Sequence, residues 1–172
     1  MALVKGKAKV TRNASNTKGV EAFLAKFKNS SVTVGVHNDA GQYPGANAPT
    51  VAQVAFWNEF GTVKMPERSF LRSTMQEQAR FIQSLLKEQV EKCMQQDITA
   101  EKALKVVGFN VQALVQKKIE SNVPPELSPS YLAQKKRKFL PERTLIATRL
   151  LLRSVTFRVN MGAGSVKKSG EP

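Results

Sequence analysis

The chain contains one cysteine and no long apolar run. Cys93 cannot form an internal disulfide, and its position on an apolar helical face predicts a buried, inert thiol. No stretch of about 18 apolar residues is present, as a membrane-spanning helix would require. The basic N-terminus also lacks the apolar segment of a signal peptide. We therefore expect a soluble protein that is made inside the cell and has no membrane partner.

The sequence also lacks the residue clusters on which catalysis depends. His37 is the only histidine and stands two residues from Asp39, but no nucleophile or second metal ligand is close to it in the sequence. There is no phosphate-binding loop of the Walker type, no dinucleotide-binding glycine pattern, and no pair of Cys or His at metal-ligand spacing. We expect no enzymatic activity, no metal and no cofactor.

The excess positive charge lies at the two ends of the chain. The net charge is +14 over 172 residues, of which residues 1–28 carry +6 and residues 127–172 carry +8, while residues 29–126 are neutral. Such a distribution predicts a surface that faces a polyanion or an acidic partner. Basic tails that only aid solubility are the alternative.

Two stretches alternate apolar and polar residues and predict strands. "SVTVGV" at 31–36 and "SVTFRV" at 154–159 each place an apolar residue at every second position. No other strong strand pattern lies between them, so we expect them to pair in one small antiparallel or mixed sheet. This pairing would also bring the two basic ends of the chain into one region.

The rest of the chain predicts helices. The helical patterns cover a short helix through Val20, Phe23, Leu24 and Phe27, one from Thr50 to Gly61, a long one from Pro66 to about Gln96, a second long one from Thr99 to Ser121, and one that begins at Ser128 and Pro129. Met75 and Leu86 fall on the apolar stripe of the first long helix. The prediction is a mostly helical α+β domain over 16–160, with a flexible basic arm at 1–15 and a flexible tail at 161–172.

One short connection, "WNEFGTVKMPERSFLRST" at 57–74, combines the features of an active-site loop and of a helix joint. Gly61 can end one helix in a left-handed conformation, and Pro66 can begin the next. Glu59 and Arg68 are spaced to form an ion pair across the turn. Glu59 has no partner carboxylate for acid catalysis, so the joint is the better interpretation.

The same residues resemble a tailed-bacteriophage family of neck and tail-completion proteins, also called virion morphogenesis or head-tail joining proteins. The motif reads Glu-Phe-Gly-Thr at 59–62, followed by Pro-x-Arg-x-Phe-Leu at 66–71, and the order of helices and strands agrees with the family over about 18–159. Before the last strand the family has a turn of the type Asp-Thr-Gly-x-Leu. Here Ala147 and Arg149 replace its Asp and Gly. Because positive φ is disfavoured for Arg149, we expect a helix to continue there.

The resemblance implies a structural role. Family members form a ring at the head-tail junction, as a neck, tail-completion or tail-terminator protein around the DNA channel. We therefore expect a homo-oligomeric ring that contacts neighbouring neck, connector or tail proteins in the virion, after assembly in the host cytoplasm. A joint or subunit interface is expected at Trp57, Glu59, Phe60, Gly61, Pro66, Arg68 and Phe70. Trp57 and Phe60 are expected in the core, with anchoring of a neighbouring subunit as the alternative.

The charge distribution and the implied DNA channel together predict contacts for the basic side chains. We expect them to contact DNA in the channel or an acidic surface of the adjoining ring: Lys5, Lys7, Lys9, Arg12, Lys135, Lys136, Arg137 and Lys138. The alternative function is a free basic nucleic-acid-binding protein. Against it, only Tyr131 and Phe139 flank the basic run, and no stacking platform or recognition helix is evident.

Overall fold

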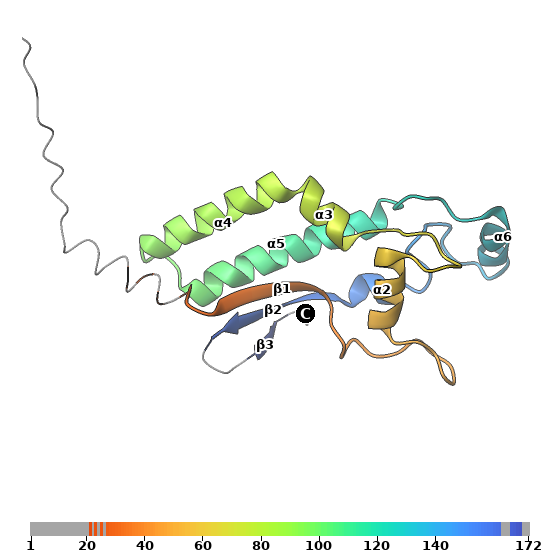
Figure 1. Ribbon diagram of the computed structural model, residues 1–172, viewed down its shortest axis with the longest axis horizontal. Coiled ribbons are helices and arrows are strands. Elements are labelled where there is room, and N and C mark those ends of the chain that lie inside the picture. Colours follow the sequence, from red (N-terminus) through yellow and green to blue (C-terminus); the bar gives the residue numbers. More distant parts are fainter. Residues whose placement is uncertain (1–20, 22, 24, 26, 163–165, 170–172) are drawn as a thin grey trace, which may run out of the picture.

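Two long helices, α4 and α5, lie over one face of a small three-stranded sheet, and α2 and α6 lie beyond one end of it (Figure 1). The computed structural model describes residues 21, 23, 25, 27–162 and 166–169. Its elements are β1 (Ser30–Val36), α2 (Val51–Phe60), α3 (Leu71–Glu77), α4 (Ala79–Met94), α5 (Ala100–Glu120), α6 (Pro129–Arg137), α7 (Leu150–Arg153), β2 (Val155–Met161) and β3 (Val166–Ser169). The architecture is α+β, as the sequence predicted.

The two predicted strands pair with each other. β1 runs antiparallel to β2, with Val32 opposite Val159 and Val36 opposite Val155. Val155, Phe157 and Val159 of β2 are buried beneath α5, while the intervening residues face away from the helices and are only half-buried. Pairing and alternation are thus confirmed.

The chain ends differ in part from the prediction. Within the predicted tail at 161–172, residues 166–169 form β3, which pairs antiparallel with the edge of β2 that β1 leaves open and satisfies backbone groups there. The predicted arm at 1–15 lies outside the described residues. So do Val20 and Leu24 of the predicted N-terminal helix.

Helix α5 forms the centre of the domain. It begins at the predicted cap, where the Thr99 hydroxyl accepts a hydrogen bond from the Lys102 N–H. A Cβ atom at Gly108 would lie 2.5 Å from Phe157 and 2.9 Å from Val32. Glycine at this position therefore lets the helix axis approach β1 and β2 closely. The periodic apolar residues of this helix form its buried face: Leu104, Val107, Val111, Val115 and Ile119.

The predicted long helix from Pro66 to Gln96 is wrong in two respects. It begins only at Leu71, and it is broken at Gln78, which separates α3 from α4. Just before the break the Thr74 hydroxyl donates to the Phe70 carbonyl, a bond that competes with the backbone ladder and bends helices. The break changes the buried face. Met75 and Leu86, predicted inside, are exposed.

Apolar side chains at the end of the domain near α2 form its largest core cluster. They come from α2, the C-terminal half of α5, α7 and the connecting loops: Val51, Ala55, Phe70, Val115, Ile119, Val123, Leu145, Ile146, Leu151 and Val155. This cluster supports the segment that the sequence singled out, because it contains Phe70 and the first turns of α2.

Candidate functional site

Helix α2 exposes its aromatic residues and buries its polar ones. Phe56, Trp57 and Phe60 are 59%, 39% and 55% exposed, whereas Asn58 and Glu59 are at most 9% exposed. We call the three aromatic residues the α2 aromatic surface. The expectation that Trp57 and Phe60 lie in the core is wrong, because the helix phase set by buried Val51 and Ala55 turns positions 58 and 59 inward.

Glu59 caps the next helix from a distance. Its carboxylate accepts hydrogen bonds from the N–H groups of Phe70 at 2.9 Å, Leu71 at 2.9 Å and Arg72 at 2.8 Å, and from the Ser69 hydroxyl at 2.7 Å. These N–H groups are the ones that the start of an α-helix leaves without internal partners, and the helix dipole favours a negative charge there. The buried carboxylate therefore fixes where α3 begins.

Arg68 does not pair with Glu59, so that prediction is wrong. The guanidinium of Arg68 is buried and donates from Nε to the Pro125 carbonyl at 2.8 Å and from Nη2 to the Glu126 carbonyl at 3.1 Å. Burial lowers the pKa of this guanidinium. Arg68 therefore ties the joint to the loop between α5 and α6, while Glu59 ties it to α3.

Gly61 ends α2 as predicted, but in a different conformation. Its φ of 74° and ψ of 176° lie outside the left-handed helical region, although the positive φ still favours glycine. A Cβ there would lie 2.9 Å from the Glu67 nitrogen, so the returning chain leaves no room for a side chain. Pro66 does not begin a helix. It lies in the extended segment that precedes Leu71.

The edge of the aromatic surface is held by Arg72. Its guanidinium lies 5.4 Å from the centre of the Phe60 ring, and the ring of Phe56 lies 4.8 Å from that of Phe60. Arg72 also forms an ion pair with Glu67. The exposed aromatic rings are therefore ordered by their neighbours and border a hollow of about 570 Å³ between α2, Val36 and Leu71.

The basic run on α6 divides into two kinds of residue. Lys135 is 2% exposed, and its Nζ donates to three backbone carbonyls, those of Pro141 at 2.8 Å, Arg143 at 2.6 Å and Ile146 at 2.6 Å. Burial and the charge of Arg68 lower its pKa. The predicted contact of Lys135 with DNA or a partner surface is therefore wrong. The other three residues of the run are exposed: Lys136, Arg137 and Lys138.

The predicted proximity of the two basic ends falls largely on residues 1–28, of which 1–20, 22, 24 and 26 lie outside the described residues. β1 begins at one end of the long axis of the molecule, whereas α6 lies at the opposite end (Figure 1). The pairing of β1 with β2 places only 155–161 beside the N-terminal strand. Four of the predicted contact residues lie outside the described part of the chain: Lys5, Lys7, Lys9 and Arg12.

A polar network covers the sheet face opposite α5. His37 Nδ1 lies 3.0 Å from the Thr156 hydroxyl, and Asp39 forms an ion pair with Arg158. Burial and the charge of Arg158 lower the pKa of His37, and Asp39 partly opposes the shift. Among the described residues no group of three His, Cys, Asp or Glu side chains is placed to hold a metal, and no described helix is long and apolar enough to span a membrane.

Comparisons with known proteins add no relatives, since no family model, curated protein or solved structure matches the chain. The sequence pattern placed either Trp57 or Phe56 inward and did not single out Asn58, whereas Phe56 is exposed and Asn58 is buried. A signal for both was present in the spacing, because a helix with Val51 and Ala55 inward must place position 58 inward and position 56 outward.

Proposed function

We propose that this chain is a structural subunit of a tailed-phage virion, assembled as a ring at the head-tail junction. The observation that carries the proposal is the joint at 57–74. Four residues of the motif shared with the neck and tail-completion family have a defined task there. Glu59 caps α3, Gly61 permits the reversal, and Arg68 and Phe70 attach the segment to the core. Four motif residues that act on one local structure support kinship of fold.

The turn before β2 supports the same proposal. Arg149 has a φ of 60° and a ψ of 5°, the left-handed conformation, and it precedes α7. The prediction that a helix continues through Arg149 is therefore wrong. The family has glycine at the corresponding position, where positive φ costs little. Positive φ at Arg149 is what a turn of the family's type would require at this position.

The α2 aromatic surface is our candidate for one half of the ring interface. Aromatic residues are enriched at the centres of protein interfaces, and a closed ring requires two different surfaces that meet. A second set of exposed apolar side chains lies on the two long helices: Phe81, Leu86, Met94 and Phe109. Contact between α2 of one subunit and these helices of the next would give the repeated heterologous interface of a ring.

Native mass spectrometry tests the ring. We expect the purified protein to show one closed oligomer without nucleic acid, and the double variant Phe56→Ser, Phe60→Ser to be a folded monomer. The matched control is Val63→Ser, since Val63 is fully exposed at the turn tip outside this surface. In the phage, deletion of the gene should leave filled heads beside unattached tails. A wild-type protein that stays monomeric at high concentration would contradict the proposal.

One observation favours a second candidate, a free nucleic-acid-binding protein. Phe139 is 97% exposed and directly follows the three exposed cations of α6. An exposed ring beside cations can stack on a base. Tight binding of single-stranded or duplex DNA by a monomer, lost on Phe139→Ala, would favour this candidate over the ring.

A further inference from the structure

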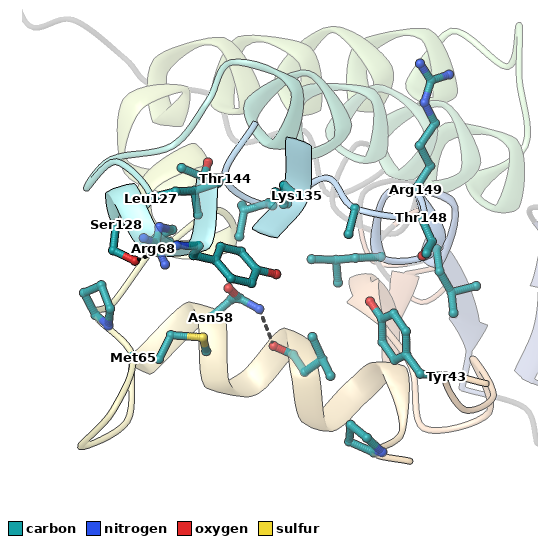
Figure 2. A pocket seen from close by; sticks show the side chains of 18 of the residues that line it. Tyr43, Asn58, Met65, Arg68, Leu127, Ser128, Lys135, Thr144, Thr148 and Arg149 are labelled. Carbon is teal, nitrogen blue, oxygen red and sulfur yellow. Dashed lines mark hydrogen bonds between the residues drawn. The ribbon is translucent and has the colours of Figure 1, made fainter. Parts of the chain in front are cut away.

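A cavity of about 820 Å³ lies between α2, α6 and the loops at 43–49, 64–68, 125–128 and 144–151. We call it the α2–α6 cavity. Figure 2 shows Arg68, Leu127 and Ser128 at one end of it and Tyr43 and Thr148 at the other. Its volume is within the range of about 300–1,000 Å³ that is usual for ligand-binding pockets. Neither the joint nor the α2 aromatic surface requires such a space.

The buried charges that line the α2–α6 cavity are all positive. Arg68 and Lys135 are 6% and 2% exposed, and both donate hydrogen bonds to backbone carbonyls. Lys135 Nζ also lies 5.8 Å from the centre of the Tyr131 ring. The one acidic residue in the lining, Glu126, is exposed. Among the described residues, therefore, no buried carboxylate balances the two cations, and a bound anion would be attracted.

Two side chains in the lining, Arg68 and Asn58, also have one polar atom each that makes no hydrogen bond to the described residues. Arg68 donates through Nε and Nη2, and among the described residues its Nη1 has no acceptor. Asn58 donates from its amide nitrogen to the Val54 carbonyl at 2.7 Å, but its Oδ1 has no donor in the described part of the chain. Asn58 is 9% exposed and projects from α2 into the space between α2 and α6 (Figure 2). The cavity thus offers one cationic donor and one neutral acceptor.

The walls favour a peptide over other anions. Four prolines and two tyrosines contribute to them: Tyr43, Pro44, Pro49, Pro66, Pro125 and Tyr131. Surfaces built from tyrosine and proline suit extended, proline-containing peptides, whose backbone carries both donors and acceptors. A DNA phosphate reaches the exposed cations of α6 more readily than these recessed ones. The chain itself carries a net charge of +14 and is a poor source of an acidic segment.

We propose that the α2–α6 cavity binds an extended acidic segment of a partner protein. A Glu or Asp carboxylate of that segment accepts a hydrogen bond from Nη1 of Arg68, and a backbone N–H donates to Oδ1 of Asn58. Tyr43 and the prolines pack against the rest of the segment. This proposal concerns a binding site on the single subunit, so it stands or falls independently of the ring.

The test uses the full chain and the peptide acetyl-Pro-Glu-Leu-Glu-Pro-amide, with a second peptide that has Gln in place of both Glu residues. In amide NMR spectra of the labelled protein, the acidic peptide should shift resonances at Tyr43, Asn58, Ser128 and Thr148. Affinity for the Gln peptide should be weaker by about tenfold or more, because a charge-assisted hydrogen bond is lost.

Two variants sharpen the test. Asn58→Asp places a carboxylate where the segment would bind. This substitution should lower the affinity for the acidic peptide by about tenfold or more. The control is Asn110→Asp on α5, where the amide makes the same bond to the carbonyl four residues earlier and lies outside the cavity lining. It should leave the affinity within about twofold.

Three results would overturn the proposal: no shift at these residues with millimolar acidic peptide, equal binding of the Gln peptide, or stronger shifts of the same residues by inorganic phosphate or a single-stranded oligonucleotide. If Asn58→Asp does not fold, the resonance map of the unaltered protein and the comparison of the two peptides decide.

Discussion

The two ends of the molecule are stabilised in different ways. Where α4 and α5 cover the sheet, apolar residues at regular spacing face inward, as Val107, Val111 and Phe157 do. At the end that holds α2 and α6, the buried set includes charged residues, and aromatic rings are exposed. The first end follows the ordinary segregation of apolar from polar side chains. The second combines the largest apolar cluster with buried charges that satisfy backbone groups of loops and helix starts.

This difference has a structural cause. The α2 and α6 end consists largely of connections, whose backbone N–H and C=O groups have no ladder partners. A side chain that is buried beside such groups must supply the missing hydrogen bonds. Glu59 accepts from N–H groups, and Arg68 and Lys135 donate to carbonyls. A charged residue in this position stabilises a loop that apolar packing alone would leave unsatisfied.

The largest effect is expected at Glu59. Glu59→Ala removes four hydrogen bonds and leaves the first N–H groups of α3 buried without acceptors, so we expect a loss of about 3 kcal/mol or more in unfolding free energy. Chemical denaturation measures it. The control is Glu67→Ala, which removes an exposed ion pair with Arg72 and should cost less than about 1 kcal/mol. Equal effects of the two substitutions would contradict the capping role.

The next largest difference in stability is expected between substitutions of two neighbouring lysines on α6. Lys135→Met leaves three carbonyls without donors and should cost about 2–3 kcal/mol, although the buried charge also disappears. Lys136→Met changes an exposed side chain whose ion pair with Glu142 spans 3.6 Å, so we expect a change within about 0.5 kcal/mol. Thermal unfolding of both variants measures the contrast. Similar melting temperatures would mean that the 141–146 loop does not depend on Lys135.

Substitutions at Gly61 and Gly41 distinguish the steric cost of an added Cβ atom from the cost of a positive φ. Gly61→Ala puts a Cβ 2.9 Å from a backbone nitrogen and should cost about 2 kcal/mol, and Gly61→Val should cost more. Gly41 also has a positive φ, of 85°, but a Cβ there meets nothing within 4 Å. Gly41→Ala should therefore cost only about 1 kcal/mol. If the two alanine variants unfold at the same temperature, the returning chain at Glu67 is not what requires glycine at 61.

Prediction from sequence succeeded for α5 and the strand pair and failed at the α2 and α6 end for one reason. Periodicity reports which residues share a face, and that was enough for the face of α5 and for the pairing of Val32 with Val159. It does not report distant hydrogen bonds. The start of α3 depends on Glu59, and the burial of Lys135 depends on a loop that follows it in the chain. The joint was therefore located correctly, while its contacts were not.

A smaller effect is expected from the exposed cations of α6. Replacing Lys136, Arg137 and Lys138 by Glu should leave the fold intact, since all three are exposed. If they face DNA or an acidic ring, the variant phage should join heads and tails poorly, with a defect that depends on salt. Lys135 is retained in this design because it is structural. Normal infectivity of the triple variant would remove these cations from the assembly mechanism.

The smallest effect is expected for the pH dependence of stability, through His37 beside the sheet. His37 has a lowered pKa in the fold, so the folded protein favours its neutral form relative to the unfolded chain, where the value is 6.5. Its contribution to stability is complete above that value and is lost as pH falls through the lower folded pKa. We expect the melting temperature to decline as pH falls below about 6.5, and to decline less in His37→Gln.

A substitution at Asp39 should change the pH dependence due to His37 in the opposite direction. Its charge raises the pKa of His37 and partly offsets the effects of burial and of Arg158. Asp39→Asn should therefore lower the folded pKa of His37 further and make the decline with acid steeper, whereas His37→Gln makes it shallower. The comparison of slopes is needed because Asp39→Asn also removes the ion pair with Arg158, which shifts the melting temperature at every pH. Identical slopes in all three proteins would show that the network on the outer sheet face does not sense protons.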